Sequence, residues 1–275
     1  MKFIYTEIRN LEFNRRVGGI LSRTFAPSYP MPMMKLKSNR QEVVFVHIPK
    51  TAGTSIANYF FQHPLKGHIP ISRLFHQDIN RYNTSFKFTF TRNPLSRFES
   101  GFYHYKRAIH EKLKMDRSHK ISELFKGIDS IDSFVSKIYS NSHYKKAVFK
   151  LPIFRPQCEW ITVPGERNQG KIIGVDFIGK YENLNQNITS LKKILGITVN
   201  AEFPVLRKND CIQNKHVRNV DSYLRLIRSY YRKDLALLDY SIWEINKSKL
   251  KRTAKDWSYL CCFGKHWIQP INMQK

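Results

Sequence analysis

The chain has 275 residues, of which 41% are hydrophobic, so it can form one large α/β domain, alone or with appendages. Its formal net charge of +26 predicts an anionic partner: a nucleotide, an acidic glycan, nucleic acid or an acidic membrane surface. The cysteines form no CxxC pair, which speaks against a cysteine-bound metal and favours reduced thiols; they are Cys158, Cys211, Cys261 and Cys262.

The first 40 residues carry arginines and short apolar pieces, with no long uncharged run. We therefore expect neither a signal peptide nor a membrane span in this part of the chain. Prolines at positions 27, 30 and 32 indicate an extended arm. We expect residues 1–40 to be an N-terminal arm that packs on the domain, with contact to a membrane surface as the alternative.

The chain is organised around the stretch VVFVHIPKTAGTS at residues 43–55. Residues 43–46 are apolar and mostly β-branched, which predicts a buried parallel strand, and Pro49 ends it because proline has no amide hydrogen for the ladder. A small polar loop follows, and apolar residues at helical spacing predict a helix from about Thr54. The first amides of such a helix have no intrahelical partner, and Lys50 adds a positive charge, so we expect a phosphate-binding loop.

This loop is not a Walker A loop, whose lysine follows the glycines, because here Lys50 comes first. HIPKTAGTS instead resembles the 5′-phosphosulfate loop of the sulfotransferases, which use 3′-phosphoadenylyl sulfate (PAPS), and most of all that of the carbohydrate sulfotransferases. Ala52 stands where a glycine is common. The resemblance implies that the donor is bound by Lys50, Thr51, Ala52, Gly53, Thr54 and Ser55. Taken alone, the loop also fits an ordinary strand–turn–helix with polar surface residues.

A loop with two prolines and a glycine follows at residues 63–70. Its KGHIP segment resembles the KxHLP segment of sulfotransferases, whose histidine is the base toward the acceptor hydroxyl. The resemblance makes His68 the candidate base, a role that suits a side chain with a pKa near neutrality. His63 and His76 are the nearby alternatives.

Residues 86–92 alternate aromatic and polar side chains, which predicts a strand, and the pattern after Pro94 predicts a helix at residues 95–107. TRNPLSRFESGFYH resembles the 3′-phosphate motif of the same enzymes. The resemblance implies that Arg92 and Ser100 bind the 3′-phosphate of PAPS. Arg97 matches the second arginine of the motif, and a structural salt bridge is an equal alternative for it.

Residues 109–150 are basic and helical in pattern, with amphipathic helices predicted from Ile121 and from Ile131. In the families that the chain resembles, such inserts shape the acceptor cleft. Their lysines and Arg117 either hold an acidic acceptor or form a solvated face. RPQCEWI at residues 155–161 resembles a segment of carbohydrate sulfotransferases that lines the site, and its Glu159 is an alternative base.

IIGVDFI at residues 172–178 predicts a further buried strand, and DFIGKYENL resembles a family element. We expect a helix at residues 184–195, with Asn183 as its N-cap and Gly196 at its end. Tyr181 follows the carboxyl end of the strand, where ligands bind in open α/β sheets, so it contacts the adenine, lines the cleft or belongs to the core.

An apolar stripe predicts a last helix at residues 220–243, and YRKDLALLDY resembles the end of these domains. The basic residues 244–275 form either a packed appendage or an interaction arm. We thus expect a sulfotransferase domain at residues 41–243 between an arm and a tail, with an α/β fold whose central parallel sheet is flanked by helices, similar to P-loop nucleotide-binding folds.

By resemblance, the reaction moves the sulfuryl group from PAPS to a hydroxyl of a polysaccharide or glycolipid and leaves adenosine 3′,5′-bisphosphate. Lys50 would act on the leaving oxygen and His68 on the acceptor proton, and no metal is needed. We expect a cytoplasmic enzyme that binds no nucleic acid, with peripheral membrane contact left open. A P-loop-type kinase and a basic module for nucleic acid or membrane surfaces are the alternatives.

Overall fold

A computed structural model of the chain describes residues 34–61, 67–112, 119–165, 170–197, 203 and 220–241. The first of two compact units, Met1–Tyr240, contains every element named below, and the second, Ser241–Lys275, is represented among the described residues by Ser241 alone. Most of the expected arm, the expected tail, His63 and Arg117 therefore lie outside the described residues.

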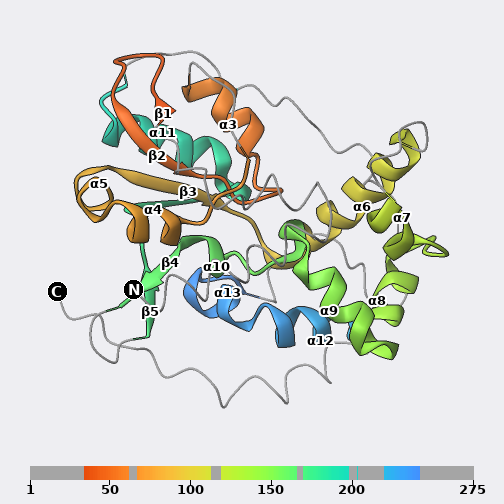
Figure 1. The fold of residues 1–275 in the computed structure, drawn as a ribbon. Helices are drawn as coiled ribbons and strands as arrows, with labels where there is room; N and C mark the ends of the chain where they lie inside the picture. Colours follow the sequence, from red (N-terminus) through yellow and green to blue (C-terminus); the bar gives the residue numbers. More distant parts are fainter. Residues whose placement is uncertain are drawn as a thin grey trace, which may run out of the picture. The chain divides into compact units, whose positions relative to one another are not determined.

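The main sheet has four strands in the order β1 (Met34–Lys35), β2 (Glu42–Val46), β3 (Lys87–Thr91) and β6 (Phe177–Lys180) (Figure 1). β2, β3 and β6 are parallel, with Phe88 in register with both Phe45 and Phe177, whereas β1 is an antiparallel edge strand. The loops that leave the carboxyl ends of the parallel strands meet at one edge of the sheet. The predicted α/β fold with a central parallel sheet is confirmed.

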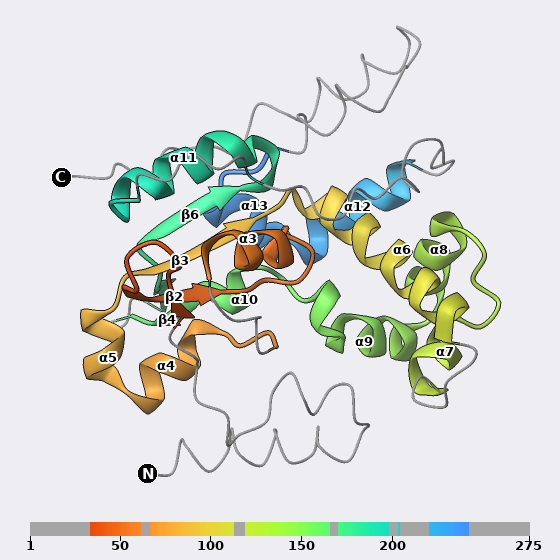
Figure 2. The same ribbon diagram turned by 90° about the horizontal axis from the view of Figure 1, so that it is seen from above.

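Helices cover both faces of this sheet (Figures 1 and 2). α3 (Gly53–Phe60) and α11 (Leu184–Ile194) pack on one face. α4 (Ile71–Gln77) and α10 (Cys158–Ile161) pack on the other, and α5 (Ile79–Thr84) follows α4. The sheet is therefore the middle layer, as the continuous apolar runs of its strands require.

The apolar run of β2 supplies both layers of the core. Val43 and Phe45 belong to the cluster under α3 and α11, and Val44 and Val46 belong to the cluster under α4 and α10. This alternation follows from the two-residue period of a strand, and all four side chains are buried. The predicted strand, its end before Pro49 and the helix that follows are confirmed.

Five further helices gather at one side of the unit around an aromatic cluster (Figures 1 and 2). They are α6 (Pro94–Lys112), α7 (His119–Phe125), α8 (Ile131–Ser140), α9 (Ser142–Lys150) and α12 (Val220–Tyr230). The last helix, α13 (Arg232–Leu237), lies beside α10 instead, and its Leu235 packs on the core cluster under α4 and α10. Phe134 of α8 lies 5.1 Å from Phe102 of α6 and 5.5 Å from Phe154, ring centroid to centroid. Both predicted amphipathic helices, α7 and α8, are confirmed. We did not predict α9 as a separate helix; its N-cap is the side chain of Asn141.

The single strand predicted at residues 172–178 is wrong. The chain forms β5 (Lys171–Ile173), which pairs antiparallel with β4 (Thr162–Pro164) in a separate sheet, and only then β6. Gly174, between the two strands, lies against Val163 and Tyr82 with no room for a Cβ, and its amide donates to the carbonyl oxygen of Ile161 at 2.7 Å. Residues 172 and 173 are consequently exposed rather than buried.

The last helix also differs from its prediction. It is interrupted at Tyr231, which is fully buried and donates from its hydroxyl to the carbonyl oxygen of Phe154 at 2.6 Å. α13 then ends at Leu237. The helix predicted at residues 184–195 is confirmed as α11, and Gly196 follows it with a φ of 61°. Asn183 stands at its N-cap position but makes no side-chain capping bond, so that detail is wrong.

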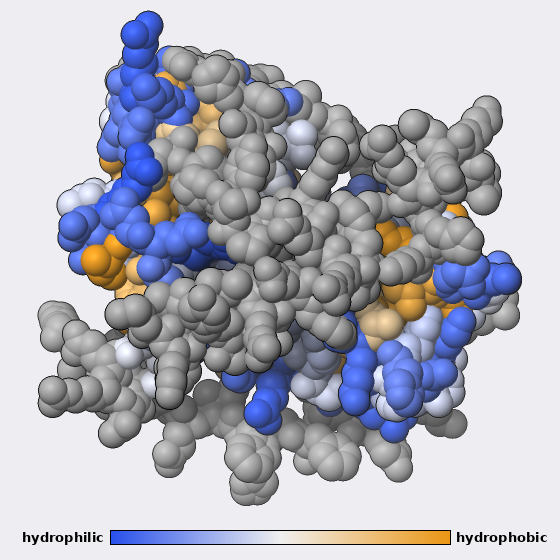
Figure 3. All heavy atoms as spheres, in the orientation of Figure 1, coloured by the Kyte–Doolittle hydropathy of each residue, from blue (hydrophilic) through white to orange (hydrophobic). Residues whose placement is uncertain are grey.

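Within the described residues, no helix combines the length and the apolar sequence needed to cross a lipid bilayer. Hydrophilic residues cover most of the coloured surface in Figure 3, and hydrophobic ones form small separate patches. In the described part of the chain, the exposed large apolar side chains are Ile79, Tyr139, Ile172, Ile173, Ile194 and Leu237. Scattered exposure of this kind is ordinary for a protein surface.

Candidate active site

Residues 47–52 between β2 and α3, the Lys50 loop, turn sharply into the helix. Lys50 and Ala52 have φ values of 71° and 66°, the left-handed region that glycine adopts at lower cost. The buried Thr51 closes the turn by donating from Oγ1 to the carbonyl oxygen of Ile48 at 2.9 Å. α3 starts where the amide of Ile56 donates to Ala52. The first amides of α3 have no intrahelical acceptor, so with Lys50 they form a site for an anion.

Arg97 of α6 connects the Lys50 loop to the segment at residues 155–161. Its side chain is buried; Nε donates to the carbonyl oxygen of Pro49 at 3.0 Å, and Nη1 to that of Arg155 at 2.9 Å. Nη2 has no hydrogen-bond partner among the described residues. Burial lowers the pKa of Arg97, although an arginine stays protonated in proteins. A buried cation with an open donor group favours an anion beside it.

Arg92 follows β3 directly and joins three elements. Its Nε lies 3.0 Å from Oγ of Ser96, its Nη1 lies 3.5 Å from the carbonyl oxygen of Lys50, and its guanidinium carbon lies 4.3 Å from the ring centroid of Tyr181. The structure thus brings Arg92, Lys50 and Tyr181 together. Ser100 is buried on α6, one helical turn beyond Ser96.

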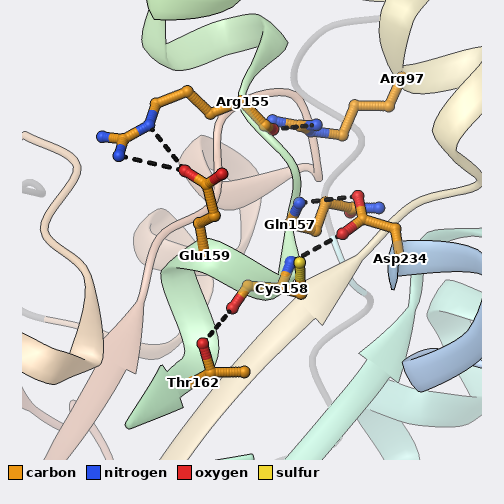
Figure 4. A network of polar contacts seen from close by, with 7 residues as sticks. All are labelled: Arg97, Arg155, Gln157, Cys158, Glu159, Thr162 and Asp234. Atoms are coloured by element: carbon orange, nitrogen blue, oxygen red, sulfur yellow. Dashed lines mark hydrogen bonds and ion pairs between the residues drawn. The ribbon is translucent and has the colours of Figure 1, made fainter. Parts of the chain in front are cut away.

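A network of polar contacts, part of it drawn in Figure 4, fixes the backbone of Arg92. The side-chain amide of Gln157 accepts from the Arg92 amide at 2.8 Å and donates to the Arg92 carbonyl oxygen at 2.7 Å. The amides of Gln157 and Cys158 both donate to the carboxylate of Asp234, at 2.7 and 2.8 Å. Burial raises the pKa of Asp234, and the two amide bonds oppose that shift.

The end of β3 is also held from its other side. Glu182 accepts from the amide of Asn93 at 2.7 Å and from the hydroxyl of Tyr240 at 3.2 Å. The Tyr240 hydroxyl also lies 2.9 Å from Oγ1 of Thr91. These contacts join the end of β3 to Glu182, which follows β6, and to Tyr240, the last residue of the first unit.

His68 lies beside the Lys50 loop and is half buried. Its Nδ1 lies 2.8 Å from the carbonyl oxygen of His47, so Nδ1 carries the hydrogen and Nε2 keeps the lone pair. Burial lowers the pKa of His68, and the positive charges of Arg97 and Lys50 add to that shift. His68 is therefore a neutral base at pH 7, with Nε2 as its basic atom.

The other proposed bases lie differently. His76 is exposed in the last turn of α4. Glu159 forms an ion pair with Arg155 at 3.1 Å (Figure 4). Among the residues that the structure describes, His68 is thus the candidate base that contacts the Lys50 loop, through its first residue, His47.

The positive charges of the candidate site indicate which ligands it can bind. Lys50, Arg92 and Arg97 lie around one edge of the sheet, next to the N-terminus of α3. No group of three His, Cys, Asp or Glu side chains among the described residues is placed to hold a metal ion. The arrangement can bind an anion with more than one negative group and can accept a proton at His68.

Four supporting residues were not predicted from the sequence: His47, Gln157, Glu182 and Asp234. All four stand in quoted motifs, so the motifs indicated the segments but not the contacts. Gln157 and Asp234 meet across 77 residues of chain, and no local pattern reports such a contact. The salt bridge considered for Arg97 is absent from the described residues, where its partners are backbone carbonyl groups.

Comparison with known proteins gives one finding. A family model described as the sulfotransferase family matches residues 36–241, three quarters of the chain. No curated protein and no solved structure matches.

Proposed function

Because the chain belongs to the sulfotransferase family, we propose that it transfers a sulfuryl group from PAPS to a hydroxyl group of a carbohydrate. The observation that carries this proposal is the meeting of two motifs. Arg97 and Arg92, from the second motif, donate to the carbonyl oxygens of Pro49 and Lys50, in the first motif. Two cationic regions thus lie next to each other, as a nucleotide with phosphate groups at two positions requires.

The residues present fit such a donor. The first turn of α3 and Lys50 suit the 5′-phosphosulfate, with hydroxyl donors from the neighbouring side chains. Arg92 and Ser100 suit the 3′-phosphate. Nη2 of Arg97, which has no hydrogen-bond partner among the described residues, is a further buried donor in this region. The residues that would hold the donor are Lys50, Thr51, Ala52, Gly53, Thr54, Ser55, Arg92, Ser100 and Tyr181.

PAPS supplies an activated sulfuryl group, whose bond to the bridging oxygen breaks while a bond from sulfur to the acceptor oxygen forms. Lys50 stabilises the negative charge that develops on the bridging oxygen. The protein mainly orients the two reactants and stabilises charge, as in phosphoryl transfer.

His68 takes the proton from the acceptor hydroxyl. Its Nδ1 bond to the His47 carbonyl leaves Nε2 unprotonated, and its lowered pKa keeps the ring neutral. A neutral imidazole with one fixed tautomer is ready to accept a proton without first losing one. The donor is held by other residues, so His68 serves the acceptor.

A carbohydrate acceptor is the finer part of the proposal. It rests on the likeness of HIPKTAGTS, of the segment at residues 155–161 and of DFIGKYENL to carbohydrate-type enzymes. A polysaccharide or glycolipid, acidic or neutral, would present the hydroxyl.

A thermal-shift comparison tests the class. We expect adenosine 3′,5′-bisphosphate to raise the melting temperature of the full chain more than ATP or a short oligonucleotide at the same concentration. A larger shift with ATP and magnesium would favour a kinase, and a larger shift with the oligonucleotide would favour a nucleic-acid-binding module.

A further inference from the structure

His47 reaches two consecutive residues of the loop that carries His68. Its carbonyl oxygen accepts from Nδ1 of His68 at 2.8 Å. Its ring forms a hydrogen bond with the backbone of Gly67. Nδ1 of the His47 ring has no hydrogen-bond partner among the described residues, so Nε2 makes that bond. One residue therefore holds both the proposed base and the residue before it.

The His47 ring also fills the space between His68 and the start of α3. Its centroid lies 4.1 Å from that of His68 and 5.9 Å from that of Phe45, on which it stacks. A Cβ at Gly53, the first residue of α3, would overlap Cδ2 and Nε2 of this ring. Gly53 thus provides space for the His47 ring, which lies against both the first residue of α3 and the proposed base, His68.

The environment of His47 keeps its ring neutral. Burial lowers its pKa well below the ordinary value of 6.5, and the nearby His68 and Lys50 lower it further. The bond to Gly67 opposes the shift, which means that the ring donates to the Gly67 carbonyl. His47 therefore serves as a fixed hydrogen-bond donor and not as a proton carrier at pH 7.

We propose that His47, the first residue of the Lys50 loop, is a positioning residue that joins this loop to His68. Its ring nitrogen holds Gly67, its carbonyl selects the Nδ1–H tautomer of His68, and Gly53 leaves the room that the ring needs. The inference rests on the proposed function in taking His68 as the base.

The first arm of the test uses no nucleotide. In the full chain with isotope-labelled histidine, nitrogen NMR shifts distinguish the two neutral tautomers of His68. We expect the Nδ1–H tautomer alone in the wild type and in His47→Gln, whose amide still donates toward Gly67. We expect a mixture in His47→Ala, because this variant keeps the backbone carbonyl of residue 47 but no longer holds Gly67, so the His68 ring is not kept in place against that carbonyl. His76→Ala is the matched control and leaves the His68 signals unchanged. A single Nδ1–H tautomer in His47→Ala would overturn the proposal.

The second arm is kinetic. We expect His47→Ala to lower kcat about 10–100-fold, the usual loss for a misplaced reacting group, while the dissociation constant of adenosine 3′,5′-bisphosphate stays as in the wild type. His47→Gln recovers most of kcat. In the His68→Ala background, His47→Ala lowers kcat no further, because its effect acts through His68. Equal losses in His47→Gln and His47→Ala, or additive losses with His68→Ala, would overturn the proposal.

A further variant covers the case in which His47→Ala does not fold. Gly53→Ala displaces the His47 ring from the other side, so it mixes the His68 tautomers; unchanged tautomers in Gly53→Ala would contradict the proposal. A wild-type chain that binds no adenosine 3′,5′-bisphosphate would refute the proposed function instead, and the NMR arm still reports on His47 and His68.

Discussion

Arg97 donates from Nε to the carbonyl oxygen of Pro49, and this 3.0 Å bond ties α6 to the loop that holds Lys50. Its Nη1 donates in parallel to Arg155. We predict that Arg97→Lys destabilises the chain by about 1.5–3 kcal/mol, because a lysine lacks the planar guanidinium fork whose Nε and Nη1 each reach one of the two carbonyl oxygens. Urea unfolding measures the change. Arg107→Lys, at an exposed position of the same helix, is the control and should stay within about 0.5 kcal/mol of the wild type. Equal effects of the two substitutions would contradict the assignment.

Arg92 should discriminate between nucleotides. We predict that Arg92→Ala weakens the binding of adenosine 3′,5′-bisphosphate by about 10–100-fold, which corresponds to roughly 1.5–3 kcal/mol for a lost charge-assisted contact. The binding of adenosine 5′-monophosphate, which lacks the 3′-phosphate, should weaken far less. Isothermal titration of both nucleotides gives the two ratios, with Arg228→Ala on the exposed face of α12 as the control. If both nucleotides lose the same affinity, Arg92 does not hold the 3′-phosphate.

Lys50 should act on the rate more than on binding. If it stabilises charge that appears only as the leaving oxygen departs, Lys50→Ala lowers kcat by orders of magnitude and changes product affinity modestly. Steady-state kinetics together with a product titration separate the two effects. A near-normal kcat with a raised KM would instead mark Lys50 as a residue for ground-state binding.

The pH dependence of kcat/KM should reflect the protonation of His68. Its pKa is lowered by burial from the ordinary 6.5, so its neutral, basic form persists to more acidic pH than in a free histidine. We predict that kcat/KM is constant near pH 7 and falls as the pH drops through this lowered value, since protonation removes the base. His68→Ala should lose about 10²–10⁴-fold in activity and this acidic limb. If His76→Ala or Glu159→Gln abolishes the limb while His68→Ala retains it, the base is the other residue.

Asp234 should matter for stability without touching either substrate. It accepts from two buried amides, those of Gln157 and Cys158. We predict that Asp234→Ala costs roughly 1–3 kcal/mol for each amide left without an acceptor. Chemical denaturation measures the loss. Glu123→Ala removes an exposed carboxylate whose ion pair with Lys126 spans 4.0 Å, and we expect it to cost at most about 1 kcal/mol. A loss no larger for Asp234→Ala than for Glu123→Ala would disprove the structural role.

The parts of the fold that the sequence predicts are those with local causes. β2 and α3 follow from an apolar run, a proline and helical spacing. β3 follows from alternating aromatic and polar residues, and α6 follows from the helical pattern that starts at Pro94. The prediction of a single strand at residues 172–178 was wrong because an apolar run does not indicate which sheet each half of it joins. The first half pairs with β4, and Gly174 lies against Val163 and Tyr82; these residues lie elsewhere in the chain.

In the candidate site, too, the residues with local sequence signals could be predicted and those with tertiary contacts could not. Motifs point to Lys50, Arg92 and His68, since the chemistry of anion binding and proton transfer requires such residue types. The contacts that place them are tertiary: His47 holds His68 across 21 residues, and Gln157 holds the backbone of Arg92 across 65. Such contacts require the folded chain, so neither His47 nor Gln157 stood out from its motif.

The central claim is that the site binds a nucleotide through phosphate groups at two positions. Calorimetric titration of the wild-type chain with adenosine 3′,5′-bisphosphate and with adenosine 5′-monophosphate tests it most directly, since the two ligands differ only in the 3′-phosphate. The account predicts that the bisphosphate binds about 10–100-fold more tightly, as one additional charge-assisted phosphate contact implies. Equal affinities for the two nucleotides, or no binding of either, would contradict it.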